Sequence, residues 1–260
     1  VTLLHTATGN VARVVEFRLP DMGRLRSAMV DGQMLYGVAN RNLYAVDLSD
    51  ESSCPPVTLD DTYSYLGVNV REMFTHLGPP FPGTILPDRL RSYPGARRLY
   101  RYGVHEGVDL YGTDAPGVTM GYSVQAIADG TVTQADVDFI EMSPAEYDAA
   151  IDRTLREHNT PLDLIDSFLG RQVRVDHGQG VESRYSHLGA VAPSIAIGAE
   201  VNSGDPIGEV GVSGTSAGVY GTADGVHLHY EIWINNRYLG QGLTLYETMR
   251  LWQAVFNDQG

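Results

Sequence analysis

The stretch Gly225-Val-His-Leu-His-Tyr-Glu231 decides the fold and the chemistry that we expect of this chain. Its alternation of residue types is typical of a β-strand, in which every second side chain points to the same face. His227 and His229 should therefore project together. Leu228 and Tyr230 should point to the opposite face. Two imidazoles on one rigid face can bind a metal ion or share proton transfer, so the stretch predicts a strand that carries a functional histidine pair.

Two stretches upstream carry further histidines. His105-Glu-Gly-Val-Asp109 sets a histidine and a carboxylate four residues apart, and Tyr185-Ser-His187 lies between it and the histidine pair. Together the three stretches supply four imidazoles and a carboxylate. This is enough for a catalytic zinc site with three protein ligands and two histidines to spare. The pattern predicts a zinc hydrolase.

Composition limits the possible partners of the chain. The 260 residues include 43% hydrophobic residues and 29 glycines, which is typical of a globular, loop-rich protein. The net charge of −14 argues against binding to nucleic acid or to anionic lipid. All 18 basic residues are arginine. No apolar run approaches the roughly 20 residues of a membrane-spanning helix, and the single Cys54 excludes an intrachain disulfide and any multi-cysteine metal site.

The chain divides into three predicted parts. Residues 1–53 alternate polar and apolar residues in short runs, and Asp31-Gly32 between two runs is a hairpin signal, so we expect a small, sandwich-like antiparallel β module. Residues 54–96 include seven of the 13 prolines and should form an extended connector. Residues 97–260 consist mainly of short strands and glycine turns, which predicts a mainly β domain built from antiparallel sheet.

A helical hairpin should interrupt this domain at residues 137–170. Ser143-Pro-Ala-Glu146 is a capping box with proline at the first helical position, and Thr160-Pro-Leu-Asp163 marks a second helix start. The hairpin follows two strands that we expect in residues 122–133, joined at Asp129-Gly130, and it could form a wall or lid of a groove. Thr244-Leu-Tyr-Glu247 repeats the capping pattern and predicts a C-terminal helix.

Five stretches in order resemble the lysostaphin/LytM-type zinc metalloendopeptidase family of peptidoglycan hydrolases, which has a duplicated hybrid motif fold. The three signature blocks are Gly103-Val-His-Glu-Gly-Val-Asp109, Tyr185-Ser-His-Leu188 and Val226-His-Leu-His-Tyr-Glu231. Val124-Gln-Ala-Ile-Ala-Asp-Gly-Thr-Val132 and Val173-Arg-Val-Asp-His-Gly178 lie between them and also resemble the family. The resemblance covers roughly residues 97–242, apart from the insertion, and leaves residues 1 to about 80 outside.

The resemblance implies a role for each candidate site residue. His105, Asp109 and His229 would bind Zn²⁺ and leave a fourth position for water. His187 and His227 would be catalytic. One would take a proton from the attacking water, and the other would stabilise the tetrahedral intermediate or protonate the leaving amine. Which histidine has which role stays open.

The resemblance also implies the substrate and the place of action. The chain would be an endopeptidase that uses a zinc-activated water to cleave peptide cross-links or stem peptides of bacterial peptidoglycan. It would act in the cell envelope or outside the cell, although Val1-Thr-Leu-Leu-His5 shows no signal-peptide pattern. Two alternatives remain at this stage. One is a non-catalytic, zinc-binding regulator of cell-wall hydrolases, against which the complete ligand set argues. The other is a hybrid-motif phosphocarrier, which would need a reactive histidine but neither Asp109 nor zinc.

The sequence also indicates possible roles for three further residues. Glu106 resembles the glutamate base of His-Glu-x-x-His enzymes, but position 109 is aspartate rather than the second histidine, so Glu106 should be a solvated neighbour of the site. Glu231 shares a strand face with His229, and either an orienting role or a structural role fits it. His177, in an Asp-His-Gly turn, should satisfy backbone groups.

Overall fold

The computed structural model describes residues 77–114 and 118–257, and before them the backbone of seven strands. Among these strands, β1 pairs with β2, β6 pairs with β7, and an antiparallel meander is formed by β3, β4 and β5. The bounds are β1 Thr2–Thr6, β2 Val11–Glu16, β3 Ser27–Asp31, β4 Met34–Ala39, β5 Asn42–Asp47, β6 Ser64–Tyr65 and β7 Val68–Asn69. Asp31 lies opposite Met34, so the predicted hairpin forms with its loop one residue later than expected. The sandwich-like packing of residues 1–53, and most of the connector before residue 77, lie outside the described residues.

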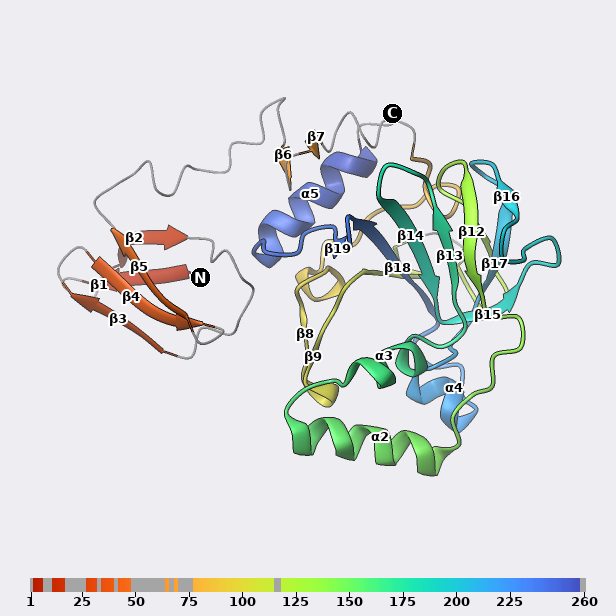
Figure 1. Ribbon diagram of the computed structural model, residues 1–260, viewed down its shortest axis with the longest axis horizontal. Coiled ribbons are helices and arrows are strands. Elements are labelled where there is room, and N and C mark those ends of the chain that lie inside the picture. Colours follow the sequence, from red (N-terminus) through yellow and green to blue (C-terminus); the bar gives the residue numbers. More distant parts are fainter. Residues whose placement is uncertain are drawn as a thin grey trace.

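A seven-stranded antiparallel sheet forms the centre of the main domain, which confirms the predicted mainly β fold (Figure 1). Its strands run in the order β10-β18-β14-β13-β12-β16, and β19 pairs with the far end of β18. The bounds are β10 Val108–Tyr111, β12 Gly130–Ala135, β13 Val173–Asp176, β14 Val181–Ser186, β16 Glu200–Val201, β18 His227–Ile234 and β19 Arg237–Tyr238.

Two smaller sheets flank it. One has the strand order β11-β17-β15, and the other consists of β8 paired with β9. The bounds are β8 Arg97–Arg98, β9 Gly103–Val104, β11 Ser123–Gln125, β15 Leu188–Val191 and β17 Pro206–Val210. The two strands expected in residues 122–133 are present as β11 and β12, but they do not pair. β11 pairs with β17, whereas β12 pairs with β13 and β16. Asp129-Gly130 therefore leads from one sheet to another, because each strand finds its hydrogen-bond partner far away in the sequence.

The central strand β18 has the predicted alternation. Leu228, Tyr230 and Ile232 are at most 1% exposed and belong to the hydrophobic core. The histidines of the same strand point to the other face. Burial of several large apolar side chains, each stabilising by about 1.5–3 kcal/mol, fixes the strand's register, because a slip by one residue would move these side chains out of the core.

The predicted helical hairpin is confirmed as α2 (Pro144–Glu157) and α3 (Leu162–Leu169). Ser143 and Glu146 form the expected capping box: the serine hydroxyl accepts from the Glu146 backbone N–H, and the glutamate accepts from the Ser143 N–H. β12 and β13, which flank the hairpin in sequence, are neighbours in the sheet. The hairpin lies beside the short helix α4 (Ser216–Tyr220) at one end of the main sheet (Figure 1).

The C-terminal helix is also confirmed, as α5 (Leu245–Asn257). Thr244 and Glu247 exchange the predicted capping hydrogen bonds of 2.8 and 3.2 Å. Trp252 is fully buried, and its ring contacts Tyr230 edge-on, so the helix packs against the core beside β18. Within the described part of the chain no helix has the length and apolar character needed to span a membrane.

Candidate metal centre

Strand register brings the candidate ligands together. Asp109 on β10 lies directly opposite His229 on β18, and Ser186 on β14 lies opposite His229 on its other side. His105 precedes β10 by one short turn, and His187 follows β14 directly. Three adjacent strands thus present their functional side chains at one place.

Three donor atoms converge at this place. His105 Nε2 lies 2.8 Å from Asp109 Oδ1 and 2.9 Å from His229 Nδ1. The third distance, from His229 Nδ1 to Asp109 Oδ1, is also 2.9 Å. The three residues form a cluster able to hold a metal ion, and all three are buried, with exposures of 2%, 7% and 4%.

Hydrogen bonds outside the cluster orient both imidazoles. His105 Nδ1 lies 3.1 Å from the carbonyl oxygen of Tyr93, and His229 Nε2 lies 2.8 Å from Glu231 Oε1. Since a carbonyl or carboxylate oxygen only accepts, each of these nitrogens carries the hydrogen. The remaining nitrogen of each neutral ring then turns its lone pair toward the cluster, as in metal sites whose histidines are fixed by a second acceptor.

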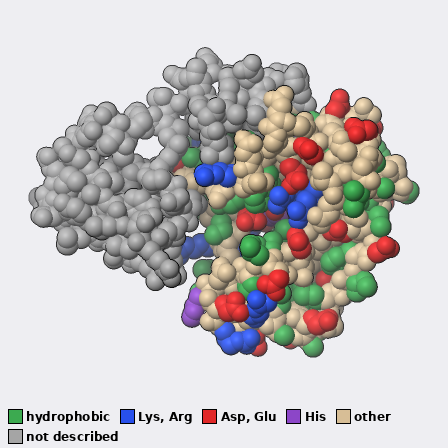
Figure 2. Space-filling model, in the orientation of Figure 1, with side chains coloured by type: hydrophobic (Ala, Val, Ile, Leu, Met, Phe, Trp, Pro, Cys, Tyr) green, Lys and Arg blue, Asp and Glu red, His purple; other side chains and the backbone are tan. Residues whose placement is uncertain are grey.

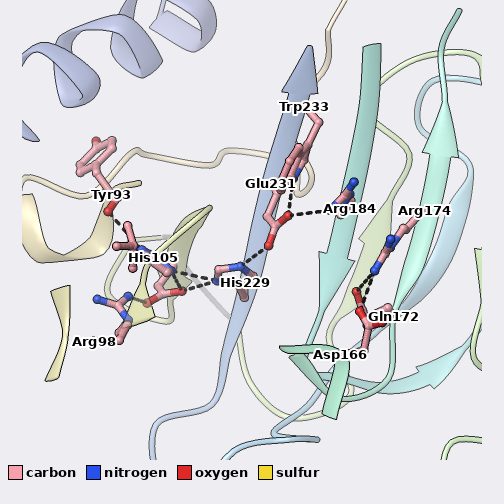
Figure 3. Close-up of polar contacts among 12 residues, drawn as sticks. Tyr93, Arg98, His105, Asp166, Gln172, Arg174, Arg184, His229, Glu231 and Trp233 are labelled. Atoms are coloured by element: carbon pink, nitrogen blue, oxygen red, sulfur yellow. Dashed lines mark hydrogen bonds and ion pairs between the residues drawn. The ribbon is translucent and has the colours of Figure 1, made fainter. Parts of the chain in front are cut away.

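Glu231 is itself held by two neighbours (Figure 3). Its Oε2 accepts a 2.5 Å hydrogen bond from Trp233 Nε1 and lies 3.7 Å from Arg184 Nη1. The Arg184 guanidinium also lies 3.9 Å from the centre of the Trp233 ring. Glu231 is 0% exposed, and its partners satisfy a carboxylate that would otherwise be costly to bury. The orienting role considered for Glu231 is therefore the one that the geometry fits.

Arg98 holds the second oxygen of Asp109. Its Nη2 donates to Asp109 Oδ2 over 2.7 Å (the arginine is labelled in Figure 3), so only Oδ1 of that carboxylate faces the two histidines. Arg98 lies on β8, which pairs with β9 just before His105.

The two remaining candidates lie beside the cluster. The His187 and His227 ring centres are 4.8 Å apart, and His227 Nε2 lies 3.7 Å from Asp109 Oδ1. His187 Nδ1 donates to the Ser213 carbonyl over 2.8 Å, and His227 Nδ1 donates to the Gly225 carbonyl over 2.6 Å. Both rings therefore keep Nε2 as a free acceptor when neutral.

Backbone conformation and ring packing fix these two histidines. His187 has a φ of 60°, the left-handed conformation that non-glycine residues rarely adopt, and its N–H donates to the Leu169 carbonyl at the end of α3. His227 stacks on Tyr111, with ring centres 4.7 Å apart and planes at 19°. A strained backbone at a candidate site is consistent with a functional constraint.

The cluster favours a positive charge at its centre. Burial lowers the pKa of His229, but its hydrogen bonds to Asp109 and Glu231 outweigh this and raise the pKa to about 9. Burial raises the pKa of Asp109, but the neighbouring His105, His227 and His229 bring it well below its ordinary value. Burial lowers the pKa of His105 to about 4. Converging lone pairs of two imidazoles and a carboxylate repel one another unless a proton or a cation lies between them.

This donor set fits zinc. Zn²⁺ takes imidazole nitrogen and carboxylate oxygen, and catalytic zinc sites use three protein ligands. His105, Asp109 and His229 supply two nitrogens and one oxygen, each imidazole is fixed by an acceptor behind it, and Arg98 leaves a single carboxylate oxygen for the ion. The fit to zinc follows from the chemistry of these donor atoms and of the groups that orient them.

Burial also affects the protonation of His187 and His227. Burial, followed by repulsion from His227 and His229, lowers the pKa of His187 well below its ordinary value. Burial also lowers the pKa of His227, although the Asp109 charge opposes the shift. Both rings are thus neutral near pH 7, the form in which Nε2 can act as a base.

A cleft of about 730 Å³ gives access to the cluster. The helical hairpin contributes Tyr147, Ile165, Phe168 and Leu169 to its lining, so the hairpin forms a wall of this cleft. Gly214 and Thr215, from the loop between β17 and α4, line it as well.

The structure brings all five predicted site residues together at one end of this cleft: His105, Asp109, His187, His227 and His229. The expectation for Glu106 was wrong, since this side chain is half-buried in the cleft lining, and burial together with the Glu231 charge raises its pKa. His177 satisfies a backbone group as expected, because its Nδ1 lies 2.8 Å from the Asp129 carbonyl.

Sequence reasoning missed the groups that orient the site. Arg98 belongs to an arginine-rich stretch whose high local charge could have marked it. The carbonyls of Tyr93, Ser213 and Gly225 had no signal, because any residue supplies a backbone oxygen.

Residues 155–240 match the model of peptidase family M23. The matched segment includes His187, His227 and His229, and it begins after the other two candidate ligands. No curated protein matches the chain.

Three of the solved structures that resemble this chain have low sequence identity to it. A zinc-containing peptidase from Vibrio cholerae is 16% identical with a TM-score of 0.40, and the match covers 79% of this chain and 48% of that one. The catalytic domain of a mutant of the prophage-encoded M23 protein EnpA from Enterococcus faecalis is 17% identical with a TM-score of 0.38, with coverage of 63% and 92%. A chain of the SpoIIQ–SpoIIIAH pore-forming complex is 23% identical with a TM-score of 0.32, with coverage of 53% and 60%.

The chain therefore spans only 60% of the pore-complex chain and 48% of the Vibrio cholerae peptidase. The family match covers β18, which carries His227 and His229, and β14, which His187 follows directly. The sequence blocks, the antiparallel fold and this match agree, which confirms the resemblance to the lysostaphin/LytM type of peptidase predicted from the sequence, with residues 155–240 as the segment that matches peptidase family M23.

Proposed function

We propose that this chain is a zinc-dependent endopeptidase that cleaves peptide cross-links or stem peptides of bacterial peptidoglycan, in the cell envelope or outside the cell. The observation that carries the proposal is the convergence of His105 Nε2, Asp109 Oδ1 and His229 Nδ1 within 2.9 Å of one another. The match to a peptidase family supports the reaction class, and the substrate follows from the resemblance to the lysostaphin/LytM family.

In this proposal His105, Asp109 and His229 hold the ion. When bound, zinc would supply Lewis-acid polarisation of the scissile carbonyl and would lower the pKa of a water molecule. His187 and His227 use Nδ1 to bind backbone carbonyls and keep Nε2 free beside the cluster. One of these Nε2 atoms would accept the proton of the attacking water, and the other would hydrogen-bond the developing charge or the leaving amine. Burial of all five side chains strengthens these electrostatic interactions.

The test is digestion of purified sacculi and cross-linked muropeptides by the zinc-loaded chain, with new peptide termini identified by mass spectrometry. His229→Ala should lose both zinc and cleavage. His187→Ala and His227→Ala should keep one zinc per chain but cleave about 10²–10⁴-fold more slowly. His158→Ala changes an exposed histidine outside the cleft lining and should behave as wild type.

Each alternative has its own signature. Wild type that binds zinc but releases no new termini would contradict the endopeptidase proposal and favour a regulator. Failure to bind zinc at all would contradict the metal centre.

A further inference from the structure

One short segment concentrates positive charge in an acidic chain. Residues 89–101 hold five of the 18 arginines and no acidic residue, although the whole chain carries a net charge of −14. We call residues 89–101 the arginine segment. On the face of the molecule in Figure 2, by contrast, acidic and arginine side chains lie interspersed.

The arginine segment faces the cleft. Four of its five arginines line the cleft that contains the metal centre, namely Arg89, Arg91, Arg98 and Arg101. The fifth, Arg97, is exposed and does not line it. Most of the charge of the arginine segment therefore borders the cleft that contains the site.

Two of these guanidinium groups are already paired with carboxylates. Arg98 binds Asp109 over 2.7 Å, and Arg89 binds Asp114 over 2.5 Å. Their charge is largely neutralised within the protein.

The other two guanidinium groups form no ion pair with a described residue. Arg101 donates to two neutral oxygens, the Thr160 hydroxyl and the Val104 carbonyl, each over 3.1 Å. The exposed Arg91 guanidinium has neither a hydrogen bond nor an ion pair with the described part of the chain.

Arg91 lies close to the metal centre. Its backbone carbonyl accepts a 3.1 Å hydrogen bond from Nη1 of Arg98, and Nη2 of the same arginine binds Asp109. Arg91 and Tyr111, whose ring stacks on His227, line the same cleft.

The acidic groups of the cleft equal its arginines in number. Asp109 and Glu231 are committed to the histidines and arginines described above, which leaves Glu106 and Asp224 against Arg91 and Arg101. A divalent cation in the metal centre would make the balance positive.

We infer that the cleft selects peptides that carry a carboxylate beside the scissile bond, and that Arg91, supported by Arg101, binds this carboxylate. The inference rests on the proposed function, because it names the substrate class of the same site. A guanidinium fork matches a carboxylate bidentately, and an ion pair inside a partly enclosed cleft is stronger than one on open surface. Tyr147 and Ile165 on the hairpin wall would contact uncharged parts of the same peptide.

The experiment measures binding by calorimetry, so that it does not depend on cleavage. The zinc-loaded full chain, with His187→Ala as the background that slows turnover, is titrated with cross-linked stem peptides. One sample has free carboxylates, and a second has them converted to primary amides with carbodiimide and ammonia. Arg91→Ala is compared with Arg97→Ala, which removes an equal charge from the same segment but outside the cleft lining.

Peptides with free carboxylates should bind about tenfold more tightly than their amides, since one charge-assisted contact has roughly that effect on affinity. Arg91→Ala should abolish the preference, and Arg97→Ala should keep it. Equal affinity for both samples, an undiminished preference in Arg91→Ala, or no binding of either sample would overturn the inference. Cleavage of free and amidated peptides at equal rates by the unmodified chain would contradict this inference but not the proposed function. Selective binding of the peptides with free carboxylates, without cleavage, would contradict the proposed function but not this inference.

Discussion

Glu231 accepts a hydrogen bond from Nε2 of His229 over 2.8 Å, although neither residue is more than 4% exposed. The two residues lie two positions apart on one face of β18, so the strand itself sets their spacing. A buried carboxylate in this position fixes the ring that presents Nδ1 to the metal centre.

Glu231→Gln should weaken zinc binding. The amide cannot accept as strongly, and its N–H group can turn toward the imidazole, so the ring loses both orientation and basicity. Partners of this kind typically change metal affinity by about 10–100-fold, and competition with a chromophoric chelator measures the change. Glu182→Gln is the matched control, because Glu182 binds the same Arg184 and is not among the hydrogen-bond partners of His229. Equal affinity in the two variants would contradict the orienting role.

Tyr111 should position His227 through its ring and not through its hydroxyl. Tyr111→Phe keeps the stacked ring and should keep kcat, whereas Tyr111→Ala removes it and should lower kcat by about ten- to a hundredfold, the range typical of a displaced catalytic group. Zinc content should be unchanged in both, which separates this effect from loss of the metal. Equal kcat in the two variants would show that the stacking has no catalytic effect.

The hairpin wall should contribute to substrate affinity through Ile165. Ile165→Ala removes apolar surface from the cleft lining and should raise KM about tenfold on cross-linked muropeptides, with little change in kcat. Leu162→Ala, three residues earlier on α3, changes a side chain that is 84% exposed and should leave KM as in wild type. The kinetics of the two variants, measured side by side, check the prediction.

His177 should make the fold less stable in mild acid. Burial lowers its pKa below the ordinary 6.5, and its Nε2 lies 2.8 Å from the Ser183 hydroxyl. Because the unfolded chain binds this proton more readily, the contribution of His177 to the free energy of unfolding is full above about pH 6.5 and is lost as the pH falls toward the lower folded pKa.

Denaturant unfolding at about pH 7 and about pH 5 tests this. The wild type should lose more stability between the two values than His177→Gln does. The zinc centre is common to both proteins, so its own pH dependence cancels in the comparison. An equal loss in the two proteins would exclude His177 as the source.

Much of the site could be predicted because its residues have a local pattern. The alternation around His227 and His229 requires only the period of a strand, and the opposite face is identified by Leu228 and Tyr230. The contact of these histidines with His105 and Asp109 was predicted from the family resemblance. His105 and His229 are 124 residues apart in the sequence, so their contact leaves no local signal.

The rest depended on contacts that a local pattern cannot specify. Asp129-Gly130 has the composition of a hairpin turn, yet β11 and β12 enter different sheets because β17 and β13 compete for them. The partners of His187 and His227 are carbonyl oxygens, which every residue carries. For residues 1–53 the strand pattern was found in the expected places, while their packing lies outside the described residues.

The insertion of α2 and α3 between two strands that already pair has a consequence for how the domain could diversify. Ala135 and Val173 are held together by the sheet, so the intervening chain closes a loop whose entropic cost rises by only about 0.6 kcal/mol for each doubling of its length. The connection can therefore be lengthened, shortened or exchanged at small thermodynamic cost as long as its last residues keep the Leu169 carbonyl in place for His187. The hairpin wall of the cleft and the catalytic residues are thus encoded in separable pieces of sequence, which makes this connection a natural point for grafting a new cleft wall onto an unchanged catalytic scaffold.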